Sequence, residues 1–261
     1  MSNAQFSTSK PHNKRILILG GSAGLGLAVA KACIETGAHV TISSSRPVRT
    51  ESAVNEILNI YPSASNRIEG YACDVSTTNV ERKIETLVEN VEKLDHIVYT
   101  AGDSLPTMPL KEVTLEKVQS SGQKRASSAL LAAKIGSKYL TRSNTCSITF
   151  STGSAMERPM PGGWSTLVFF AAGFTGMTHP LAFDPAPIRV NIVAPGVVGN
   201  TNLWGGMPKK LREQFMRSYA EMVPTGQTGK VEDVAEACLY FLRDANVTGS
   251  VLDRNSGGFL V

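Results

Sequence analysis

A glycine-rich turn near the start of the chain constrains the fold more than any other feature. The apolar run 15–19 leads directly into Gly20-Gly21-Ser22-Ala23-Gly24-Leu25-Gly26, and a segment of helical length follows. Glycines in such a turn let backbone N–H groups approach a diphosphate without interference from Cβ atoms, and the N-terminus of the next helix adds partial positive charge. The turn predicts a nucleotide site that contains Gly20, Ser22, Gly24, Leu25 and Gly26, with a purely structural turn as the alternative.

The rest of the chain repeats this order of strand and helix. Apolar runs suited to buried parallel strands alternate with amphipathic segments, which is typical of a doubly wound α/β sheet. The predicted strands are 15–19, 39–43, 67–73, 96–99, 147–151, 189–194 and 250–252, and the predicted helices are 25–36, 51–61, 79–93, 114–139, 165–182 and 231–243. We expect a single Rossmann-like domain over residues 14–261, with a seven-stranded parallel sheet and helices on both faces. Residues 1–13 are expected to form a disordered tail, in which Ser2-Asn3-Ala4 is typical of a cloning scar.

Charge and composition narrow the class of protein. The net charge is +4, but lysines and arginines are scattered, which indicates a solvated surface and no nucleic-acid partner. We find no run of about 18 apolar residues, so no membrane span is expected. The first ten residues lack the apolar stretch of a secretion signal, which predicts a cytoplasmic protein. Four cysteines form no C-x-x-C pair, so reduced thiols are expected and no metal site.

Two long loops follow predicted strands, at 103–109 and at 196–209. Ligands of open parallel sheets bind outside the carboxyl ends of the strands, so both loops are expected to border a substrate. The segment 210–222 that follows the second loop has Leu211, Phe215, Met216 and Tyr219 at helical spacing. This spacing predicts an amphipathic lid helix, with plain surface packing as the alternative.

The end of the second predicted strand indicates which dinucleotide binds. An acidic residue there would bind a ribose diol, whereas a basic residue would pair with a 2′-phosphate. The sequence is Ser43-Ser44-Ser45-Arg46, without an acid. Because the arginine fork suits phosphate and serine hydroxyls add donors, Ser44, Ser45 and Arg46 predict NADP(H). A merely solvated Arg46 is the alternative.

Several further motifs occur in a fixed order along the chain. The spacing G-x-x-x-G-x-G, Cys73-Asp74-Val75, Thr100-Ala101-Gly102, Arg189-Val190-Asn191 before Pro195-Gly196, and Thr248-Gly249 with Gly257-Gly258 together resemble the short-chain dehydrogenase/reductase family. The resemblance covers residues 14–261. It implies a cofactor site that also includes Asp74, Val75, Thr100, Ala101, Gly102, Pro195, Gly196, Val198 and Thr201.

The reaction centre departs from that family. An asparagine, a serine, a tyrosine and a lysine handle protons in the family, and the tyrosine gives its proton to a carbonyl oxygen as hydride arrives. Matching the resemblance places Leu167 at the tyrosine, Ala171 at the lysine and Arg125 at the asparagine. Ser154 has the spacing of the family serine, with Ser151 and Thr152 as alternatives.

Loss of the acid limits the chemistry. General acid catalysis contributes about 10² to 10⁴ in rate, so ordinary ketone reduction should be crippled. An iminium ion needs only hydride, because its nitrogen already carries the positive charge. A pocket that orients a substrate for cyclisation by proximity needs no acid either. The apolar run Leu167-Val168-Phe169-Phe170 predicts a bulky aromatic or polycyclic substrate.

A smaller group within the family shares the departures. The sequence is similar to short-chain reductase relatives of indole-alkaloid pathways, which lack the tyrosine and combine NADPH-dependent iminium reduction with Diels-Alder cyclisation. They carry an arginine at the asparagine position and a tryptophan before the catalytic helix, as Arg125 and Trp164 do here, but their acidic residue has no counterpart in 160–163. Arg125, Ser154 and Trp164 are therefore the candidate catalytic residues. A structural salt bridge for Arg125 and a packed loop position for Trp164 are the alternatives.

Two competing functions can be tested. A non-catalytic cofactor-binding or scaffold protein could fill the pocket at the nicotinamide end, for example with Phe169 and Phe170. An ordinary NADP(H)-dependent carbonyl reductase would need another tyrosine, Tyr99, Tyr139 or Tyr219, near the nicotinamide. The family resemblance implies a homodimer or homotetramer that assembles through the fourth and catalytic helices, and the small-residue run 126–133 is compatible with such assembly.

Overall fold

The computed structural model describes residues 11–261 except 92, 103–104, 106, 159–161 and 200. Seven strands form one parallel sheet in the order β3-β2-β1-β4-β5-β6-β7. Their bounds are β1 Arg15–Leu19, β2 His39–Ser44, β3 Ile68–Ala72, β4 His96–Tyr99, β5 Ser147–Ser151, β6 Arg189–Pro195 and β7 Val251–Arg254. The strand order reverses between β1 and β4, and a ligand site is expected outside the carboxyl ends of the strands there.

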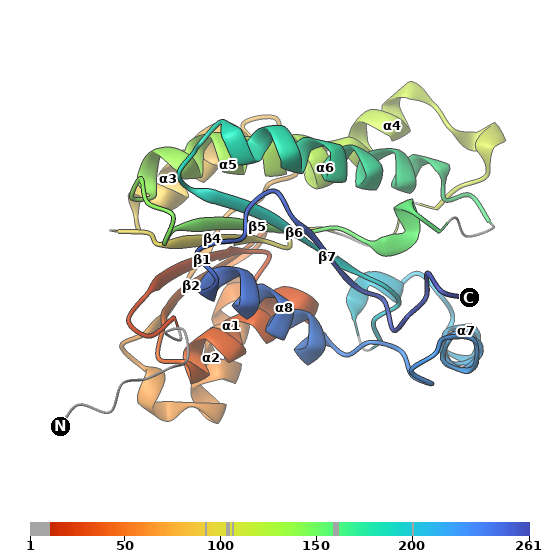
Figure 1. The fold of residues 1–261 in the computed structure, drawn as a ribbon, viewed down its shortest axis with the longest axis horizontal. Helices are drawn as coiled ribbons and strands as arrows, with labels where there is room; N and C mark the ends of the chain where they lie inside the picture. The colour runs from red at the N-terminus through yellow and green to blue at the C-terminus, as the bar shows by residue number, and fades with distance from the viewer. Residues whose placement is uncertain (1–10, 92, 103–104, 106, 159–161, 200) are drawn as a thin grey trace.

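Helices cover both faces of the sheet, as Figure 1 shows. One face carries α3, α5 and α6, and the other carries α1, α2 and α8, while α7 lies beside the C-terminus. The bounds are α1 Gly24–Glu35, α2 Pro47–Ile60, α3 Val80–Glu89, α4 Leu115–Gly122, α5 Ser128–Tyr139, α6 Ser165–Phe183, α7 Lys209–Met222 and α8 Val231–Arg243. A separate apolar core fills each face of the sheet. The predicted doubly wound fold is confirmed.

Three predicted helices differ from the structure. The helix predicted over 114–139 is interrupted by a π-helical segment, Gln123–Ser127, between α4 and α5. The third helix ends at Glu89, several residues before the predicted end. The second helix begins at Pro47 and not at residue 51. Proline favours the first helical position because its fixed φ angle is helical and because the N–H group that it lacks would have no partner within the helix there.

From the sequence we expect no segment long and apolar enough to cross a membrane, and by these two criteria alone that expectation is wrong. Helix α6 has 19 residues and is apolar enough to do so, and 28% of its most apolar stretch is buried. Its buried side faces the sheet through Phe174, Thr178 and Leu181. The remaining apolar surface therefore needs an explanation other than the core.

The first residues described belong to the segment predicted as a tail. The backbone N–H of Asn13 donates to the carbonyl of Gly37 at 3.0 Å, so the chain already contacts the domain at this point. Residues 1–10, including the predicted cloning scar, lie outside the described residues. The domain boundary at residue 14 stays a prediction.

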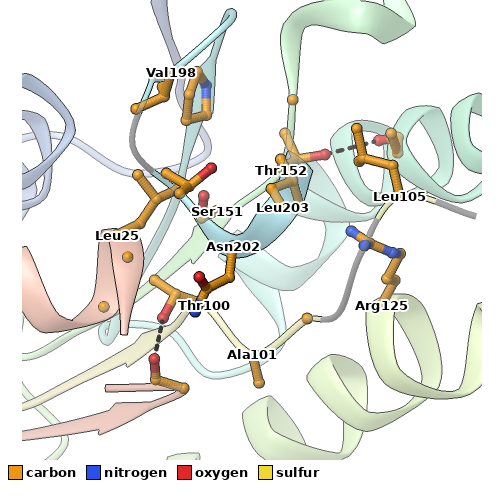
Figure 2. Close-up of a pocket in the computed structure, with 18 of the residues that line it drawn as sticks. Leu25, Thr100, Ala101, Leu105, Arg125, Ser151, Thr152, Val198, Asn202 and Leu203 are labelled. Atoms are coloured by element: carbon orange, nitrogen blue, oxygen red, sulfur yellow. Dashed lines mark hydrogen bonds between the residues drawn. The ribbon is translucent and has the colours of Figure 1, made fainter. Parts of the chain in front are cut away.

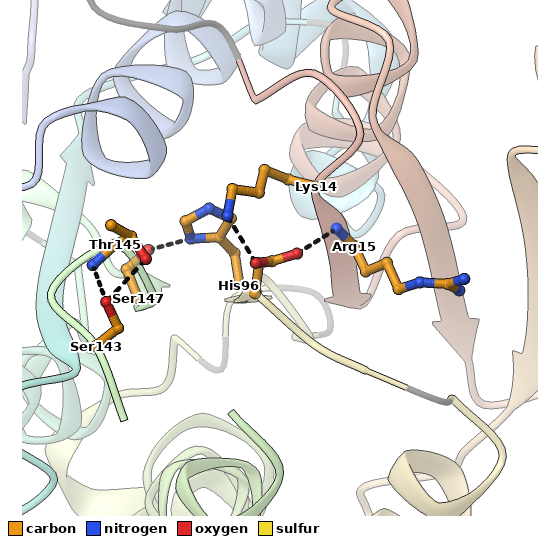
Figure 3. A network of polar contacts seen from close by, with 7 residues as sticks. Lys14, Arg15, His96, Ser143, Thr145 and Ser147 are labelled. Atoms are coloured by element: carbon orange, nitrogen blue, oxygen red, sulfur yellow. Dashed lines mark hydrogen bonds and ion pairs between the residues drawn. The ribbon is translucent and has the colours of Figure 1, made fainter. Parts of the chain in front are cut away.

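A network of polar side chains lies at the amino edge of the sheet (Figure 3). Asp95 accepts hydrogen bonds from the Lys14 ammonium at 2.8 Å and from the Arg15 backbone N–H at 2.9 Å. Burial raises the pKa of Asp95, but these two donors outweigh it and lower the pKa. His96 is 1% exposed, and its Nδ1 lies 2.8 Å from the Ser147 hydroxyl. Burial lowers the pKa of His96 to about 3, so its ring is neutral at physiological pH.

Candidate cofactor and reaction site

A large pocket opens at the carboxyl edge of the sheet. Its volume is about 1050 Å³, at the upper end of the range of about 300–1,000 Å³ for ligand sites. The loops after β1, β2, β3, β4, β5 and β6 line it, together with parts of α1, α6 and α7 and the C-terminal segment. This is the edge at which doubly wound sheets bind ligands, and the volume leaves room for a dinucleotide and a substrate.

The glycine-rich turn forms one wall of the pocket and fits a diphosphate. Gly20 has a φ of 89°, and a Cβ there would lie 2.6 Å from the backbone nitrogen of Ala101. A Cβ on Gly26 would overlap the carbonyl oxygen of Gly20 and the hydroxyl of Thr100. The turn is therefore closed tightly against the end of β4, and helix α1 starts at Gly24 with its N-terminus at the pocket.

Two further polar groups are placed for a cofactor. The buried hydroxyl oxygen of Thr201 has no hydrogen-bond partner among the described residues, and its side chain lies over Gly24. A buried hydroxyl without a partner costs free energy, which a ligand at this position would recover. The Asp74 carboxylate accepts hydrogen bonds from the Ser76 backbone N–H at 3.0 Å and from the Ser76 hydroxyl at 2.6 Å, so its orientation is set. Both features fit a bound dinucleotide.

All but one of the predicted cofactor residues line this pocket. The structure brings together Gly20, Ser22, Gly24, Leu25, Gly26, Ser44, Ser45, Asp74, Val75, Thr100, Ala101, Gly102, Pro195, Gly196, Val198 and Thr201. The exception is Arg46, which is exposed and does not line the pocket. Arg49 lines the pocket instead and was missed, because the second helix was predicted to begin after it. Pro47 was the signal that could have placed Arg49 in a first helical turn.

The reaction end of the pocket lies between β5 and α6 (Figure 2). Leu167 and Ala171 both line it, and Leu167 is only 6% exposed. Ser151, Thr152 and Ser154 line it too, and the Thr152 hydroxyl lies 3.5 Å from the Ala171 carbonyl oxygen. Hydroxyl groups thus surround the reaction end, while the side chains at the predicted tyrosine and lysine positions are apolar.

Arg125 projects into the pocket from the π-helical segment (Figure 2). The wider π turn often marks functional sites, because it displaces a side chain from the regular helical face. The Arg125 guanidinium lies against the turn after β4, 3.6 Å from the position of a Cβ on Gly102. Neighbouring Gly122 allows the close contact that fixes this segment, because a Cβ there would overlap the ring of Phe170 on α6.

Aromatic side chains line the substrate space in two groups, which form two walls of the pocket. Trp164, Phe170 and Phe174 come from α6 and its entry, and Trp204, Phe215 and Tyr219 come from the loop after β6 and from α7. In the second group the ring centroids are 5.3 Å apart between Trp204 and Phe215, and 6.4 Å apart between Phe215 and Tyr219. The predicted helix is confirmed as α7, and it contributes Phe215, Tyr219 and Met222 to the pocket, whereas Leu211 and Met216 do not line it. Its role as a lid stays a prediction.

The C-terminal segment closes the substrate space. Gly258 and Phe259 line the pocket, and the Arg158 guanidinium donates a hydrogen bond to the Gly258 carbonyl. Arg158, Trp204 and Phe259 were not predicted as site residues. They come from three distant parts of the chain, so no local spacing in the sequence groups them.

The three tyrosines named as substitutes for the missing acid differ in position. Tyr139 is 36% exposed and does not line the pocket. Tyr99 lines the pocket but is 2% exposed, and burial raises its pKa. Tyr219 lines the pocket and donates its O–H to the Asn255 carbonyl at 3.2 Å. The cations that line the pocket in the described chain are Arg49, Arg125 and Arg158, so no lysine is present there to activate a phenol.

Among the residues that the structure describes, no group of three or more His, Cys, Asp and Glu side chains could hold a metal ion.

Comparisons with known proteins agree with this geometry. A family model described as an SDR-like Rossmann domain matches residues 7–261. The short-chain dehydrogenase/reductase fsr5 of Gibberella fujikuroi is 36% identical over 258 residues, which is 97% of both chains. The short-chain dehydrogenase/reductase malC of Malbranchea aurantiaca is 35% identical over 253 residues, which is 95% of both chains.

Two solved structures are similar to the whole fold. The MalC reductase/Diels-Alderase from Malbranchea aurantiaca has a TM-score of 0.89 at 34% identity, over 96% of this chain and 98% of that chain. A small-chain dehydrogenase in complex with NADPH has a TM-score of 0.77 at 25% identity, over 95% of this chain and 100% of that chain.

Proposed function

The chain belongs to the short-chain dehydrogenase/reductase family, and on that premise we propose that it is an NADP(H)-dependent enzyme of specialised, alkaloid-type metabolism that works without a tyrosine proton. Its chemistry is reduction of an iminium, cyclisation of a bulky polycyclic substrate, or both. One observation carries the proposal: the pocket that holds the complete glycine cradle has Leu167 and Ala171 at its reaction end. The cofactor site is retained while the acid and its activator are replaced by apolar groups.

The residues of the pocket suit hydride transfer to an iminium. NADPH supplies the hydride when it is bound, and a second structure of this fold was solved with NADPH. An iminium carbon accepts hydride without proton delivery to the neighbouring atom. Arg125 and the hydroxyl groups of Ser151, Thr152 and Ser154 then orient polar groups of the substrate, while Trp164 stacks on a flat ring.

The aromatic walls suit cyclisation. Proximity and orientation alone can lower an activation barrier by about 7–11 kcal/mol when two reacting groups are held together. The MalC protein, whose fold covers nearly all of this chain, is described as a reductase/Diels-Alderase. Trp164 and Trp204, which belong to the two aromatic groups that line the pocket, would hold a folded polycyclic substrate with its reacting ends together.

A matched pair of substrates tests the proposal. N-methyl-3,4-dihydroisoquinolinium and 1-tetralone share a bicyclic skeleton, but only the ketone needs a proton, which goes to its oxygen when hydride reaches the carbon. We expect NADPH oxidation, followed at 340 nm, with the iminium and at least about 10²-fold slower oxidation with the ketone. Comparable rates with both would support an ordinary carbonyl reductase and overturn the proposal.

Two observations weigh against the competing functions. Phe169 is 66% exposed and does not line the pocket, and Phe170 lines it but leaves a volume of about 1050 Å³, so the two side chains do not fill the space as a scaffold protein would allow. The carbonyl-reductase alternative needs an activated phenol, yet the O–H of Tyr219 is directed at Asn255 and Tyr99 is buried. Measurements of cofactor binding and of turnover with the two substrates above test both alternatives directly.

Arg125→Gln tests the role of the guanidinium at the substrate end. Hydrogen bonds from a charged group contribute about 1.5–3 kcal/mol, so turnover of the iminium should fall about 10- to 100-fold. The dissociation constant of NADPH should change less than about threefold, because the glycine cradle remains. A large loss of NADPH affinity with unchanged turnover would place Arg125 in the cofactor site instead.

The exposed face of α6 indicates assembly with a second copy of the chain. Phe169 and Phe183 are exposed on it at 66% and 81%, and Gly173 and Gly176 leave open space above the helix. Such a large apolar surface is more often a protein interface than free surface, and small residues let another helix approach. We therefore favour a homodimer or homotetramer over membrane insertion, and a cytoplasmic location stays a prediction.

Phe169→Glu tests this assembly. A charge in the contact should reduce the oligomer to a smaller species in analytical ultracentrifugation. Ile60→Glu is the control, because Ile60 is 51% exposed at the end of α2 on the other face of the sheet. A monomeric wild type, or equal effects of both variants, would reject α6 as the interface.

A further inference from the structure

Two arginines follow strand β2, and the structure separates their roles. Arg46 and Arg49 are both exposed, but only Arg49 lines the pocket, where it joins Ser44 and Ser45. Neither guanidinium forms an ion pair with a carboxylate in the described part of the chain. The donors of Arg49 therefore remain available to a ligand in the pocket.

The start of helix α2 explains why the nearer arginine is outside the pocket. Arg46 is the N-cap, with extended φ and ψ of −136° and 138°, and Pro47 is the first helical residue. Arg49 is the third helical residue. Because side chains on a helix tilt toward its N-terminus, a long side chain at the third position covers the turn before it. That turn is where β2 delivers Ser44 and Ser45.

The orientation of α2 about its axis is set by the next residue. Thr50 is 2% exposed, and its hydroxyl donates to the Pro47 carbonyl at 2.7 Å. Its Cβ lies 3.2 Å from the position of a Cβ on Gly70 of β3, so Thr50 packs against the sheet. Successive helical residues are about 100° apart, and Arg49 is thereby turned from the sheet toward its carboxyl edge.

The charge around Arg49 suits a dianion. The first turn of α2 contains no acidic residue, and the 14-residue helix presents its partial positive end there. Asp74 is the one carboxylate among the described residues that line the pocket, and it is held by Ser76. A guanidinium binds phosphate through two parallel N–H donors, and the hydroxyls of Ser44 and Ser45 can add two more.

We propose that Arg49, and not Arg46, pairs with the 2′-phosphate of NADP(H) and sets the preference for NADP(H) over NAD(H). This inference rests on the proposed NADP(H) binding. It replaces the residue that the sequence pattern alone assigned to the phosphate, and it explains the choice of cofactor by the geometry of one helical turn.

Binding measurements on the two arginines test the proposal. Wild type, Arg49→Ala, Arg49→Lys and Arg46→Ala are titrated with NADPH, NADH, 2′,5′-ADP and 5′-AMP by calorimetry. Arg49→Ala should weaken NADPH and 2′,5′-ADP about 10- to 100-fold and leave NADH and 5′-AMP within about twofold. Arg49→Lys should recover part of the loss, because it keeps the charge without the fork. Arg46→Ala, the matched control, should change NADPH less than about threefold.

The outcomes separate this inference from the proposed function. Selective loss of NADPH in Arg46→Ala with none in Arg49→Ala would overturn the assignment while NADP(H) binding stands. Equal weakening of NADPH and NADH in Arg49→Ala would show that Arg49 does not read the phosphate and would also overturn it. A wild type that binds none of the four ligands would overturn the proposed function itself.

Discussion

The two edges of the sheet differ in whether their polar side chains find hydrogen-bond partners within the protein. At the amino edge, Asp95, His96 and Ser147 each have a partner within the protein (Figure 3). At the carboxyl edge, the Thr201 hydroxyl has no partner among the described residues, and the glycine turn faces a pocket of about 1050 Å³. Buried polar groups are unfavourable unless they are hydrogen-bonded. The network around Asp95 and His96 is therefore satisfied as folded, although Nη2 of the buried Arg189 at the start of β6 has no hydrogen-bond partner among the described residues, whereas a ligand would complete the carboxyl edge.

Gly26→Ala should have the largest effect at the carboxyl edge. Its Cβ would overlap the carbonyl oxygen of Gly20, which belongs to the cradle itself. Since this neighbour is backbone, the turn must open, and we expect loss of measurable NADPH binding by calorimetry. A thermal unfolding scan distinguishes an opened turn from an unfolded protein.

Gly206→Ala is the matched control for this variant. A Cβ at Gly206 would meet no heavy atom within 4 Å, and it lies in the loop before α7. NADPH affinity should stay within about twofold of wild type. Normal NADPH binding by Gly26→Ala would show that the turn does not need to fit a cofactor and would remove the contrast between the two edges.

Restoring the family pair should produce the next largest change. Leu167→Tyr with Ala171→Lys places a phenol and an ammonium at the reaction end, four residues apart on α6. General acid catalysis should raise the rate of 1-tetralone reduction by up to about 10² to 10⁴, with NADPH oxidation as the measurement. Leu167→Phe with Ala171→Met is the control for shape alone.

The restored pair also tests whether the missing tyrosine and lysine are what limits ketone reduction at the carboxyl edge. Equal ketone rates in the restored and control variants would mean that the missing acid is not what limits ketone reduction. The apolar reaction end would then be a consequence of substrate shape, and iminium selectivity would need another cause.

Much of the fold and of the cofactor end could be predicted because their signals are local. Strand β1 is apolar after its first residue and is adjacent in sequence to the following turn, and the buried strands β5 and β6 are rich in β-branched and aromatic residues. Leu167 and Ala171 were located by aligning the helix from Ser165 onward with Ala182 and Pro195-Gly196, and Ser154 was then assigned by its spacing from Leu167. The structure places Leu167, Ala171 and Ser154 in the wall of one pocket.

The rest could not be predicted because it depends on tertiary packing. The π-helical segment that presents Arg125 forms where Gly122 admits the ring of Phe170, a contact between α4 and α6. The second aromatic wall needs Trp204 and Phe215 to meet across the loop after β6. The family resemblance implied contacts through the catalytic helix, but apolarity alone does not say which side of α6 the sheet covers and which side stays exposed.

At the amino edge, His96 should make stability depend on pH. Its pKa is about 3 in the folded protein and close to 6.5 when unfolded, so between these values only the unfolded chain binds the proton. The contribution of His96 to the free energy of unfolding is fully present above pH 6.5. It is lost as the pH falls, by about 1.4 kcal/mol per pH unit once the unfolded ring is protonated. Urea unfolding between pH 7.5 and 4.5 measures this slope.

His96→Gln removes the titration and keeps a group that can pair with Ser147. The readout is the slope of stability against pH and not the absolute stability, which the substitution also lowers. We expect a flatter slope in the variant between pH 6.5 and 4.5. An unchanged slope would mean that another group controls acid stability and that the amino edge is not as completely satisfied as its hydrogen bonds indicate.

The smallest effect is expected for the ion pair at the same edge. Lys14 and Asp95 are 2.8 Å apart, but their side chains are 37% and 25% exposed, so water screens them. Lys14→Met keeps the aliphatic stem and should lower the free energy of unfolding by less than about 1 kcal/mol. Asp95 would still accept a hydrogen bond from the Arg15 backbone N–H. Lys31→Met, which breaks the pair with Glu56, is the matched control, and urea unfolding measures both. A decrease in the free energy of unfolding of more than about 2 kcal/mol in Lys14→Met alone would show that the ion pair acts together with the buried His96 network. The hydrogen-bonded network of the amino edge would then extend to this surface pair.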